Sequence, residues 1–299
     1  MVSHSDRGPA RLKLTQYHAD TPPAYPRRVP LPLPKSLSPS KVSKFTDCAL
    51  AFRFSAIDRL PEPPSPHIVK GTLVHGALER LFWELPRGER SAVAARKALD
   101  AAWEALESGP EIEGLELSND EREAFVRDAW ALVEGYLKLE DPDTVDAAGI
   151  ELLLEAEVGG VMLRGIVDRL DVTPGGDLVI VDYKTGRVPS EIQERQRLGG
   201  VHFYALLCEE VLGLRPTLVR LMYLREPLVI ETAPSDQALR GLKQRTAAVW
   251  AAIERSCAAE DFRPKPGPLC DWCSFRSHCP AFGGDPSPTT DLAAAGASR

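Results

Sequence analysis

The sequence predicts an α/β protein in which a mixed central β-sheet is flanked by helices and preceded by a helical region. Three observations support this fold class. Apolar residues follow helical spacing as far as about residue 140, short apolar runs with turn residues between them begin at about residue 150, and a helical pattern returns at about residue 190. The change of period places the sheet in the second half of the chain.

Four helices are predicted before the sheet. A short capped helix begins near Ser40 and carries Cys48, and three longer amphipathic helices follow. The last of these is marked by Ser118 and Glu121, whose spacing is that of a capping box. The longer helices are expected at about residues 71–85, 91–107 and 118–140.

The predicted sheet begins with three strands, IELLLEAEV, VMLRGIVDRLDV and DLVIVDYKT, and TPGG forms the turn between the last two. A helix with the capping pattern Ser190 to Gln193 follows and stops at Gly213. Two more strands and a long helix complete the pattern. The strands are expected at residues 150–158, 161–172, 177–185, 216–224 and 227–232, and the helices at 190–212 and 235–260.

The two ends of the chain differ in composition from the part between them. Residues 1–37 are rich in proline, which disfavours both helix and central strand, so we expect a flexible leader there. Residues 283–299 are expected to form a disordered tail, which leaves residues 38–282 as one domain. The sequence contains no G-x-x-x-x-G-K-[ST] loop, which argues against an intrinsic ATPase.

The composition argues against some classes of binding partner and indicates the cellular compartment. The net charge of −7 argues against a protein that coats nucleic acid through bulk positive charge, so any polyanion would need a local basic groove. No apolar run approaches the roughly 20 residues of a membrane span, and the N-terminus lacks a signal peptide, so no membrane partner and a cytoplasmic location are expected. Three of the six cysteines cluster at residues 270–279, near the C-terminus, which suits a metal centre in a reducing compartment.

Asp182 and Lys184 end the third predicted strand, within LVIVDYKTGR. Side chains two residues apart on a strand share a face, so these two are neighbours. One interpretation is an ion pair at the strand end. The other is a catalytic site, because the hairpin brings Asp168 to the same edge of the sheet. Two carboxylates suit Mg²⁺ or Mn²⁺, and a lysine can orient or help deprotonate water and stabilise a phosphoryl transition state.

Asp168 followed by Asp-Tyr-Lys at 182–184 resembles the PD-(D/E)xK nuclease superfamily, and GTLVHGALERLF resembles the histidine-bearing first motif of its RecB-like branch. The resemblance covers about residues 40–282. It implies a restriction-endonuclease-like core and a metal-dependent deoxyribonuclease. It also implies that Asp168, Asp182 and Lys184 are catalytic, and that His75, Asp168, Asp182 and Tyr183 hold Mg²⁺ or Mn²⁺.

His75 lies on an amphipathic helix, where a histidine is more often structural than a ligand. Its order in the chain, ahead of Asp168 and the Asp-Tyr-Lys motif, favours the metal-ligand role that the resemblance implies. Glu79 lies one helical turn later on the same face and is a weaker candidate ligand.

One motif departs from the RecB-like pattern. The branch usually has Q-L-x-x-Y on the next helix, and here Tyr204 matches whereas Gly200 replaces the glutamine. Gln196, one turn earlier, is a candidate substitute, and Tyr204 and Gln196 are candidate substrate-binding residues. Two helical glycines, Gly199 and Gly200, are explained by tight helix packing or by close approach of DNA. Three arginines after the strand are candidate phosphate contacts or members of a solvated face: Arg187, Arg195 and Arg197.

The C-terminal cysteines Cys270, Cys273 and Cys279 have C-x2-C-x5-C spacing and need a fourth ligand, for which Cys48 is the candidate. The pattern resembles the iron–sulfur nuclease modules of AddB and the CRISPR-associated RecB-like exonucleases, which implies a [4Fe–4S] cluster that staples the chain ends. The alternatives are a zinc site, with His278 as a candidate ligand, and plain thiols. Cys208 and Cys257 lie in helical patterns and are expected to be buried.

The leading hypothesis is therefore a metal-dependent DNA exonuclease that acts on single-stranded ends in repair or recombination, alone or beside a helicase partner. A second hypothesis is a non-catalytic, nucleic-acid-binding iron–sulfur scaffold, which the replacement by Gly200 keeps open. A third is a zinc-ribbon interaction protein unrelated to nucleases.

Overall fold

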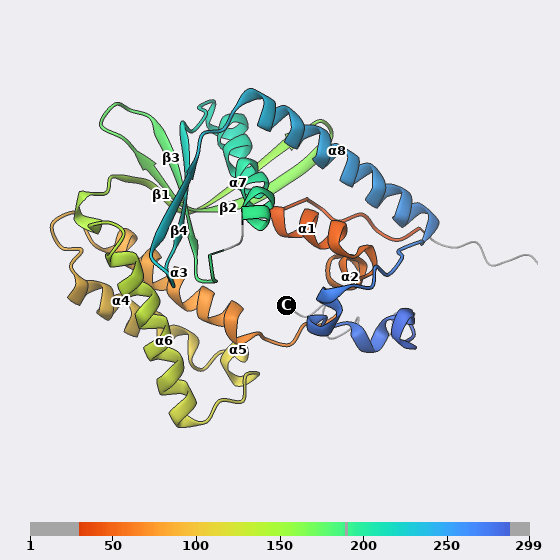
Figure 1. Cartoon of the computed structure of the whole chain (residues 1–299), viewed down its shortest axis with the longest axis horizontal. Helices are drawn as coiled ribbons and strands as arrows, with labels where there is room; N and C mark the ends of the chain where they lie inside the picture. Colours follow the sequence, from red (N-terminus) through yellow and green to blue (C-terminus); the bar gives the residue numbers. More distant parts are fainter. Residues whose placement is uncertain (1–29, 189–190, 288–299) are drawn as a thin grey trace, which may run out of the picture.

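A five-stranded mixed β-sheet forms the centre of the protein (Figure 1). The strands lie in the order β1-β2-β3-β4-β5, and β3 and β4 are parallel whereas the other neighbours are antiparallel. The computed structural model describes residues 30–188 and 191–287, without the side chains of 191–199. The expected α/β class with a mixed sheet is confirmed. The strands are β1 (Ala147–Val158), β2 (Val161–Val172), β3 (Leu178–Lys184), β4 (Leu218–Tyr223) and β5 (Leu228–Thr232).

Helices cover both faces of the sheet (Figure 1). One face packs against α3, α4 and α6, where β3 contributes Val179 and Val181 to the core. The opposite face packs against α7, α8 and the N-terminal helices, where β3 contributes Leu178 and Ile180. Because successive side chains of a strand point to opposite faces, a strand covered on both sides is apolar throughout. The α-helices are α1 (Pro39–Asp47), α2 (Ala49–Phe52), α3 (Pro66–Glu84), α4 (Ala92–Leu106), α5 (Pro110–Glu113), α6 (Asn119–Leu137), α7 (Glu191–Leu212) and α8 (Asp236–Ala259), and short 3-10 or π turns are η1 (Arg53–Ile57), η2 (Pro142–Thr144), η3 (Pro268–Trp272), η4 (Arg276–His278) and η5 (Pro280–Phe282).

Local signals set several helix ends where the sequence predicted them. The capping box at α6 is present, with Ser118 and Glu121 each accepting a backbone N–H of the other. Gly213 has a φ of +68° directly after α7, a conformation that glycine adopts without strain. The expected N-terminal cap of α7 at Ser190 lies outside the described residues.

The N-terminal boundary differs from the expectation. Residues 30–37 belong to the expected flexible leader, yet Leu37 is fully buried, and its backbone N–H donates to the Met162 carbonyl at 2.8 Å. Leu31 likewise donates to the Cys257 carbonyl at 3.1 Å. Proline excludes a helix but not an extended segment that packs against the fold, so the folded part already includes Leu31. Residues 1–29 and 288–299 lie outside the described part.

Cys48 also differs from the expectation of a helical position. α1 begins at Pro39, one residue earlier than expected, because the Ser38 side chain caps it by accepting the Lys41 N–H at 3.3 Å. The helix ends at Asp47, and Cys48 has extended backbone angles between α1 and α2. Cys48 therefore lies at the bend between the two helices and not within a helix.

The C-terminal segment, blue in Figure 1, returns to lie beside α1 and α2. Phe275 is 3% exposed and packs on Phe54, with ring centroids 5.5 Å apart. The Lys265 ammonium donates to the Thr46 carbonyl at 3.1 Å. Two ends of the folded region are therefore neighbours. Within the described ranges, no helix has the length and apolar character required to cross a membrane.

Candidate active site

The end of the β2–β3 pairing brings Asp168, Asp182 and Lys184 together. The β2–β3 ladder begins at Arg169, so Asp168 is the first residue of β2 beyond the paired stretch. Its carboxylate accepts the backbone N–H of Tyr183 at 2.7 Å, which fixes it beside the Asp-Tyr-Lys motif. Asp182 and Lys184 form an ion pair on their shared face of β3. The expected neighbourhood of these residues is present.

His75 reaches the same place from α3. Its Nδ1 lies 3.6 Å from an Asp168 oxygen and also 3.6 Å from an oxygen of Glu151. Glu151 is on β1 and was not a sequence candidate. The β1–β2 register pairs Ile150 with Arg169 on one side of it and Leu152 with Val167 on the other, which sets Glu151 opposite Asp168.

Glu151 has an unusual backbone, because its φ is +43° within a strand. Non-glycine residues rarely adopt positive φ, and such strain concentrates at functional positions. The register of the β1–β2 hairpin could have identified Glu151 from the sequence. The turn at Gly159 and Gly160 fixes this register, and counting residues back from the turn places Glu151 across from Asp168.

The donor set of His75, Glu151 and Asp168 fits a divalent cation. One ligand atom from each of the three lies within 4.8 Å of the others. A six-coordinate ion with ligands at about 2.1 Å holds neighbouring ligand atoms about 3 Å apart and opposite ones about 4 Å apart, so only small adjustments are needed. Oxygen and imidazole ligands suit Mn²⁺ or Mg²⁺. Asp182 lies near this group but pairs with Lys184, and Tyr183 could contribute only its backbone carbonyl, because its hydroxyl accepts a hydrogen bond from Arg169.

The charges in this cluster perturb one another. Burial, together with the charge of Asp182, raises the pKa of Asp168 to about 7. For His75, burial lowers the pKa, but the hydrogen bond to Glu151 and the charge of Asp168 outweigh it, and the pKa is raised overall. Burial likewise opposes the charge of Lys184, whereas the Asp182 carboxylate raises its pKa. A lysine that stays protonated is suited to orienting water and stabilising charge more than to accepting a proton.

A buried hydrogen-bond network supports the site from behind. Arg169 is 0% exposed, donates to the Tyr183 hydroxyl at 2.8 Å, and forms a two-bond pair with Asp171. It also pairs with Glu140 at the end of α6. Tyr183 lies between Asp182 and Lys184 in the strand, and its side chain is on the opposite face of β3 from theirs. The network therefore anchors the motif through the Tyr183 side chain.

The other residues that the sequence suggested as site residues do not all lie at the candidate metal site. Tyr204 lines the same cavity as Asp168 and Glu151, and its ring packs on Gly165, where an added Cβ would come within 2.9 Å of it. Glu79 is exposed and lines a neighbouring cavity without joining the compact donor group. Arg187 is exposed after β3. The side chains of Gln196, Arg195 and Arg197 lie outside the described part.

Tight helix packing does not explain Gly200. A Cβ built there meets no atom of the described structure within 4 Å, so packing against the described residues does not account for this glycine.

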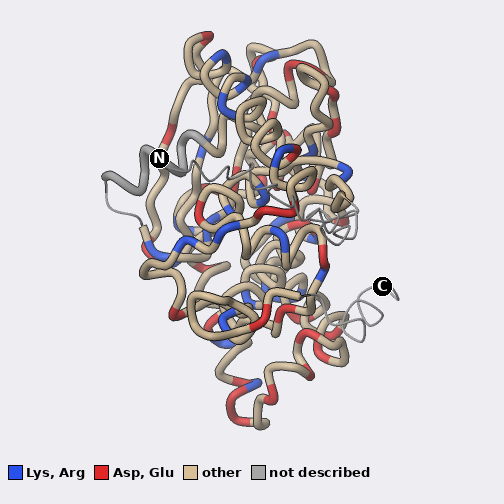
Figure 2. Tube along the Cα trace, turned by 90° about the vertical axis from the view of Figure 1, so that its right-hand side faces the viewer, with Lys and Arg blue, Asp and Glu red and all other residues tan. Residues whose placement is uncertain are grey.

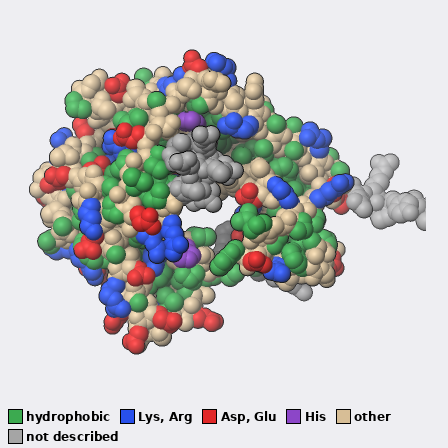
Figure 3. All heavy atoms as spheres, in the orientation of Figure 1, with side chains coloured by type: hydrophobic (Ala, Val, Ile, Leu, Met, Phe, Trp, Pro, Cys, Tyr) green, Lys and Arg blue, Asp and Glu red, His purple; other side chains and the backbone are tan. Residues whose placement is uncertain are grey.

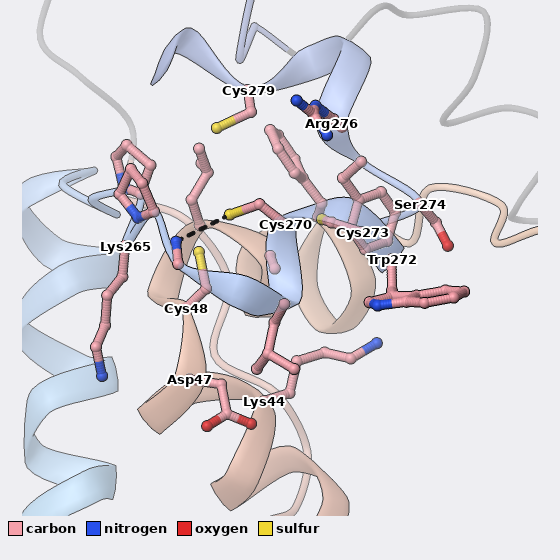
Figure 4. Close-up of a pocket in the computed structure, with 18 of the residues that line it drawn as sticks. Lys44, Asp47, Cys48, Lys265, Cys270, Trp272, Cys273, Ser274, Arg276 and Cys279 are labelled. Carbon is pink, nitrogen blue, oxygen red and sulfur yellow. Dashed lines mark hydrogen bonds between the residues drawn. The ribbon is translucent and has the colours of Figure 1, made fainter. Parts of the chain in front are cut away.

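The four candidate cluster cysteines line one pocket of about 620 Å³ (Figure 4). Cys48 comes from the bend between α1 and α2, and the other three come from the C-terminal turns. Burial raises the pKa of Cys273, and the thiols of Cys48, Cys270 and Cys279 raise it further. The Cys270 sulfur accepts the backbone N–H of Gly267 at 3.3 Å, drawn as the dashed line in Figure 4.

The spacing of these sulfurs bears on which metal centre they suit. Four thiolates around one zinc ion lie about 3.8 Å apart, given Zn–S bonds of about 2.3 Å. Among the described residues the cysteines do not form a group of three whose sulfurs lie within 4.8 Å of one another. A four-iron cube holds its thiolates farther apart than zinc does, because each thiolate binds a different iron. Cys208 and Cys257 are 0% and 2% exposed, as expected for buried thiols.

Comparison with known proteins identifies the class. The family model described as the PD-(D/E)XK nuclease superfamily matches residues 36–280, so the chain belongs to this superfamily. Two relatives are each named Gene 69 protein. The one from Mycobacterium phage D29 is 25% identical over 269 residues, which cover 82% of this chain and 96% of the relative. The one from Mycobacterium phage L5 is 24% identical over 286 residues, with the same coverage of 82% and 96%.

The fold is also similar to a solved structure, the crystal structure of a "Putative exonuclease" from Eubacterium rectale. The two chains share 14% sequence identity and a TM-score of 0.47, and the match covers 80% of this chain and 87% of the other.

Proposed function

We propose that the protein is a metal-dependent deoxyribonuclease that hydrolyses phosphodiester bonds of DNA at single-stranded ends. The observation that carries the proposal is the cluster of His75, Glu151 and Asp168 beside the Asp182–Lys184 pair, in a chain of a nuclease superfamily. We assign this activity to DNA repair or recombination, in which the enzyme acts alone or beside a helicase.

Each residue has a distinct role in the proposed reaction. His75, Glu151 and Asp168 would hold Mg²⁺ or Mn²⁺, and Asp182 would add a carboxylate on the side of Lys184. The cation, when bound, supplies Lewis-acid stabilisation of the phosphate oxygens and lowers the pKa of bound water. The protonated Lys184 orients the attacking water and stabilises the charge that develops on the phosphate. Tyr204 borders the cavity through which the substrate reaches Asp168.

We further propose that Cys48, Cys270, Cys273 and Cys279 bind a [4Fe–4S] cluster. The shared pocket of the four cysteines supports a metal centre there, and the pattern of one remote cysteine with a C-terminal trio favours a cluster over a single zinc ion. The role is structural, because the ligands join the first helices of the domain to its last turns. The nuclease domain then extends through residue 282 and includes the cluster module.

A non-catalytic nucleic-acid-binding scaffold is the second candidate, and the replacement of the family glutamine by Gly200 is the observation that favours it. Both candidates bind nucleic acid, so binding alone does not separate them. Metal-dependent cleavage does.

The test is digestion of DNA labelled at one end by protein purified without oxygen. We expect single-stranded DNA to be shortened from an end in the presence of Mn²⁺ or Mg²⁺, and no cleavage when EDTA is present. Duplex DNA with blunt ends should be cut more slowly. If the pure protein binds DNA but leaves it intact at every Mn²⁺ concentration, the scaffold candidate is correct.

A further inference from the structure

A cavity of about 910 Å³ opens beside the candidate active site. One wall is the N-terminal segment from Pro32 to the start of α1 together with residues 55–59, and the other is formed mainly by β2, with Glu151 of β1 and Tyr204 of α7. Glu151 and Asp168 line it, so the cavity reaches the candidate metal ligands. Figure 3 shows an opening near the middle of the molecule, between the lobe that contains the sheet and α3 and the lobe that contains α1, α2 and the C-terminal turns.

The charge of this cavity differs from that of the whole protein. Acidic and basic residues are interspersed along the chain (Figure 2), and the net charge is −7. The lining nevertheless contains four cationic side chains, Lys35, Lys41, Arg59 and Arg164, and its only acids among the described residues are Glu151 and Asp168. Apart from the two candidate metal ligands, the lining is therefore basic.

These cations are poorly neutralised by the protein itself. Within the described residues, Lys35, Lys41 and Arg59 have no carboxylate oxygen within 4.0 Å, and the Lys41 ammonium donates to the Ser36 carbonyl at 3.0 Å. Arg164 pairs with Glu155 at 3.3 Å, but both side chains are about half exposed, so the pair is weak. Burial and the charges of Arg164 and Arg59 lower the pKa of Lys41, which shows that the cations converge.

The cavity also offers surfaces for unpaired bases. Leu33 and Ile166 line it and are each 45% exposed, although both are large apolar side chains. The first turn of α1 lines the same wall, and helix N-termini favour phosphate groups. Cations that follow a backbone, together with apolar surfaces for bases, are the elements of a single-strand binding groove.

A second, smaller cavity of about 570 Å³ lies on the far side of the candidate metal ligands. It is lined by His75 and Glu151 together with Gly71, Thr72 and Gly76 of α3, and it contains none of the four cations. Glu151 borders both cavities. Glu151 therefore lies between a basic cavity and one whose described lining contains no lysine or arginine.

We propose that the cavity lined by Lys35, Lys41, Arg59 and Arg164 binds the phosphodiester backbone of a single DNA strand on one side of the bond to be cut. The proposal rests on the proposed nuclease function and adds the path of the substrate. The strand occupies the basic cavity, its scissile phosphate lies at His75, Glu151 and Asp168, and the short released end lies in the smaller cavity. Holding only one side firmly lets the cut product leave.

The test is equilibrium binding in EDTA, which does not depend on cleavage. Anisotropy of a short fluorescein-labelled oligothymidylate is measured against salt concentration for the wild type and for Lys41→Gln, Arg59→Gln and Arg164→Gln. Release of counterions predicts that each lost contact weakens binding about fivefold at 0.1 M salt and reduces the salt slope by about 0.7. The triple variant should lose about 100-fold. The matched control is Arg127→Gln on α6, whose arginine is exposed and lies outside this cavity.

The outcomes separate this proposal from the proposed function. The groove is supported if the three variants keep the wild-type melting temperature, lose affinity and slope as stated, and Arg127→Gln does neither. It is overturned if the folded triple variant binds the oligonucleotide with wild-type affinity and slope. A duplex competitor that displaces the strand as well as unlabelled oligothymidylate overturns the single-strand part. Failure of the nuclease function would appear instead as normal binding without metal-dependent cleavage.

Discussion

The carboxylate site and the cysteine site are built in opposite ways. The carboxylate site arises from neighbouring strands, in which the register of β1, β2 and β3 sets Glu151, Asp168 and Asp182 close together before any ion binds. The cysteine site joins Cys48 to three cysteines near the other end of the chain, through short turns with little regular structure. The first site is held by the sheet, and in the proposed function its cation serves the chemistry. The second, with its proposed cluster, would hold the two ends of the folded region together.

The largest expected effect comes from breaking the cysteine site. Cys48→Ser removes the proposed ligand between α1 and α2, and because metal-site energy is also folding energy, the variant should lose iron, acid-labile sulfide and thermal stability together. For a chain of this size each kcal/mol lost lowers the melting temperature by about 2–4 °C. Iron and sulfide analysis of anaerobically purified protein, with a thermal melt, measures the effect.

The matched control is Cys208→Ser. Cys208 is fully buried but lies in α7, outside the cysteine pocket, so this variant should keep its iron and lose only the stability that burying a hydroxyl costs. If the Cys48→Ser protein keeps its full iron and sulfide, Cys48 is not a ligand, and His278 becomes the candidate for the fourth ligand. Colourless protein that contains zinc and no sulfide would refute the cluster itself.

The carboxylate site should respond in affinity rather than in folding. His75→Ala and Glu151→Gln should weaken the apparent affinity for Mn²⁺ about 10- to 100-fold, and cleavage should partly recover at high Mn²⁺. Glu79→Gln is the matched control, because Glu79 is exposed on the same helix as His75 and lies outside the donor group. Mn²⁺ titration of activity measures all three. An unchanged Mn²⁺ requirement in His75→Ala would leave that histidine a structural role.

A smaller effect is expected on the stability of the metal-free protein. The pKa of Asp168 is raised to about 7, so between pH 4 and 7 the native state binds more protons at this group than the unfolded state does. Stability from this group is therefore present at low pH and is lost as pH rises towards 7. Asp168→Asn should raise the melting temperature in EDTA at pH 8, by about 3 °C for each kcal/mol relieved, and should change it less at pH 5. A lower melting temperature for Asp168→Asn at pH 8 would contradict the raised pKa.

The sequence predicted the sheet and the helices well because their signals are local. Alternating burial, the TPGG turn and the capping box each act within a few residues, and β2, β3 and α6 lie close to their predicted ranges. Asp168, Asp182 and Lys184 were found for the same reason, since one hairpin brings them together. Glu151 was not found, because its position depends on the register of a second hairpin and on a backbone strain that no composition reveals.

Two other features depended on tertiary structure. The proline-rich residues 31–37 pack beside β2 because Leu37 fills a buried site and exchanges backbone hydrogen bonds with Met162 and Arg164. The Arg169 network joins α6 to β3, and a lone arginine in a strand gives no indication of such partners. In both cases the deciding contact is with a segment far away in the sequence.

The most direct test of the account compares wild-type protein with Lys184→Ala in one assay, with iron content and Mn²⁺-dependent cleavage of end-labelled single-stranded DNA measured on the same samples. Lys184 lies at the carboxylate site and not at the cysteine site, so the variant should keep its iron and sulfide, bind DNA in EDTA, and lose cleavage by about 10²- to 10³-fold or more. Lys97→Ala, a surface change on α4, should leave both quantities at wild-type values. Undiminished Mn²⁺-dependent cleavage by Lys184→Ala would contradict the claim that the chemistry takes place at the end of β3.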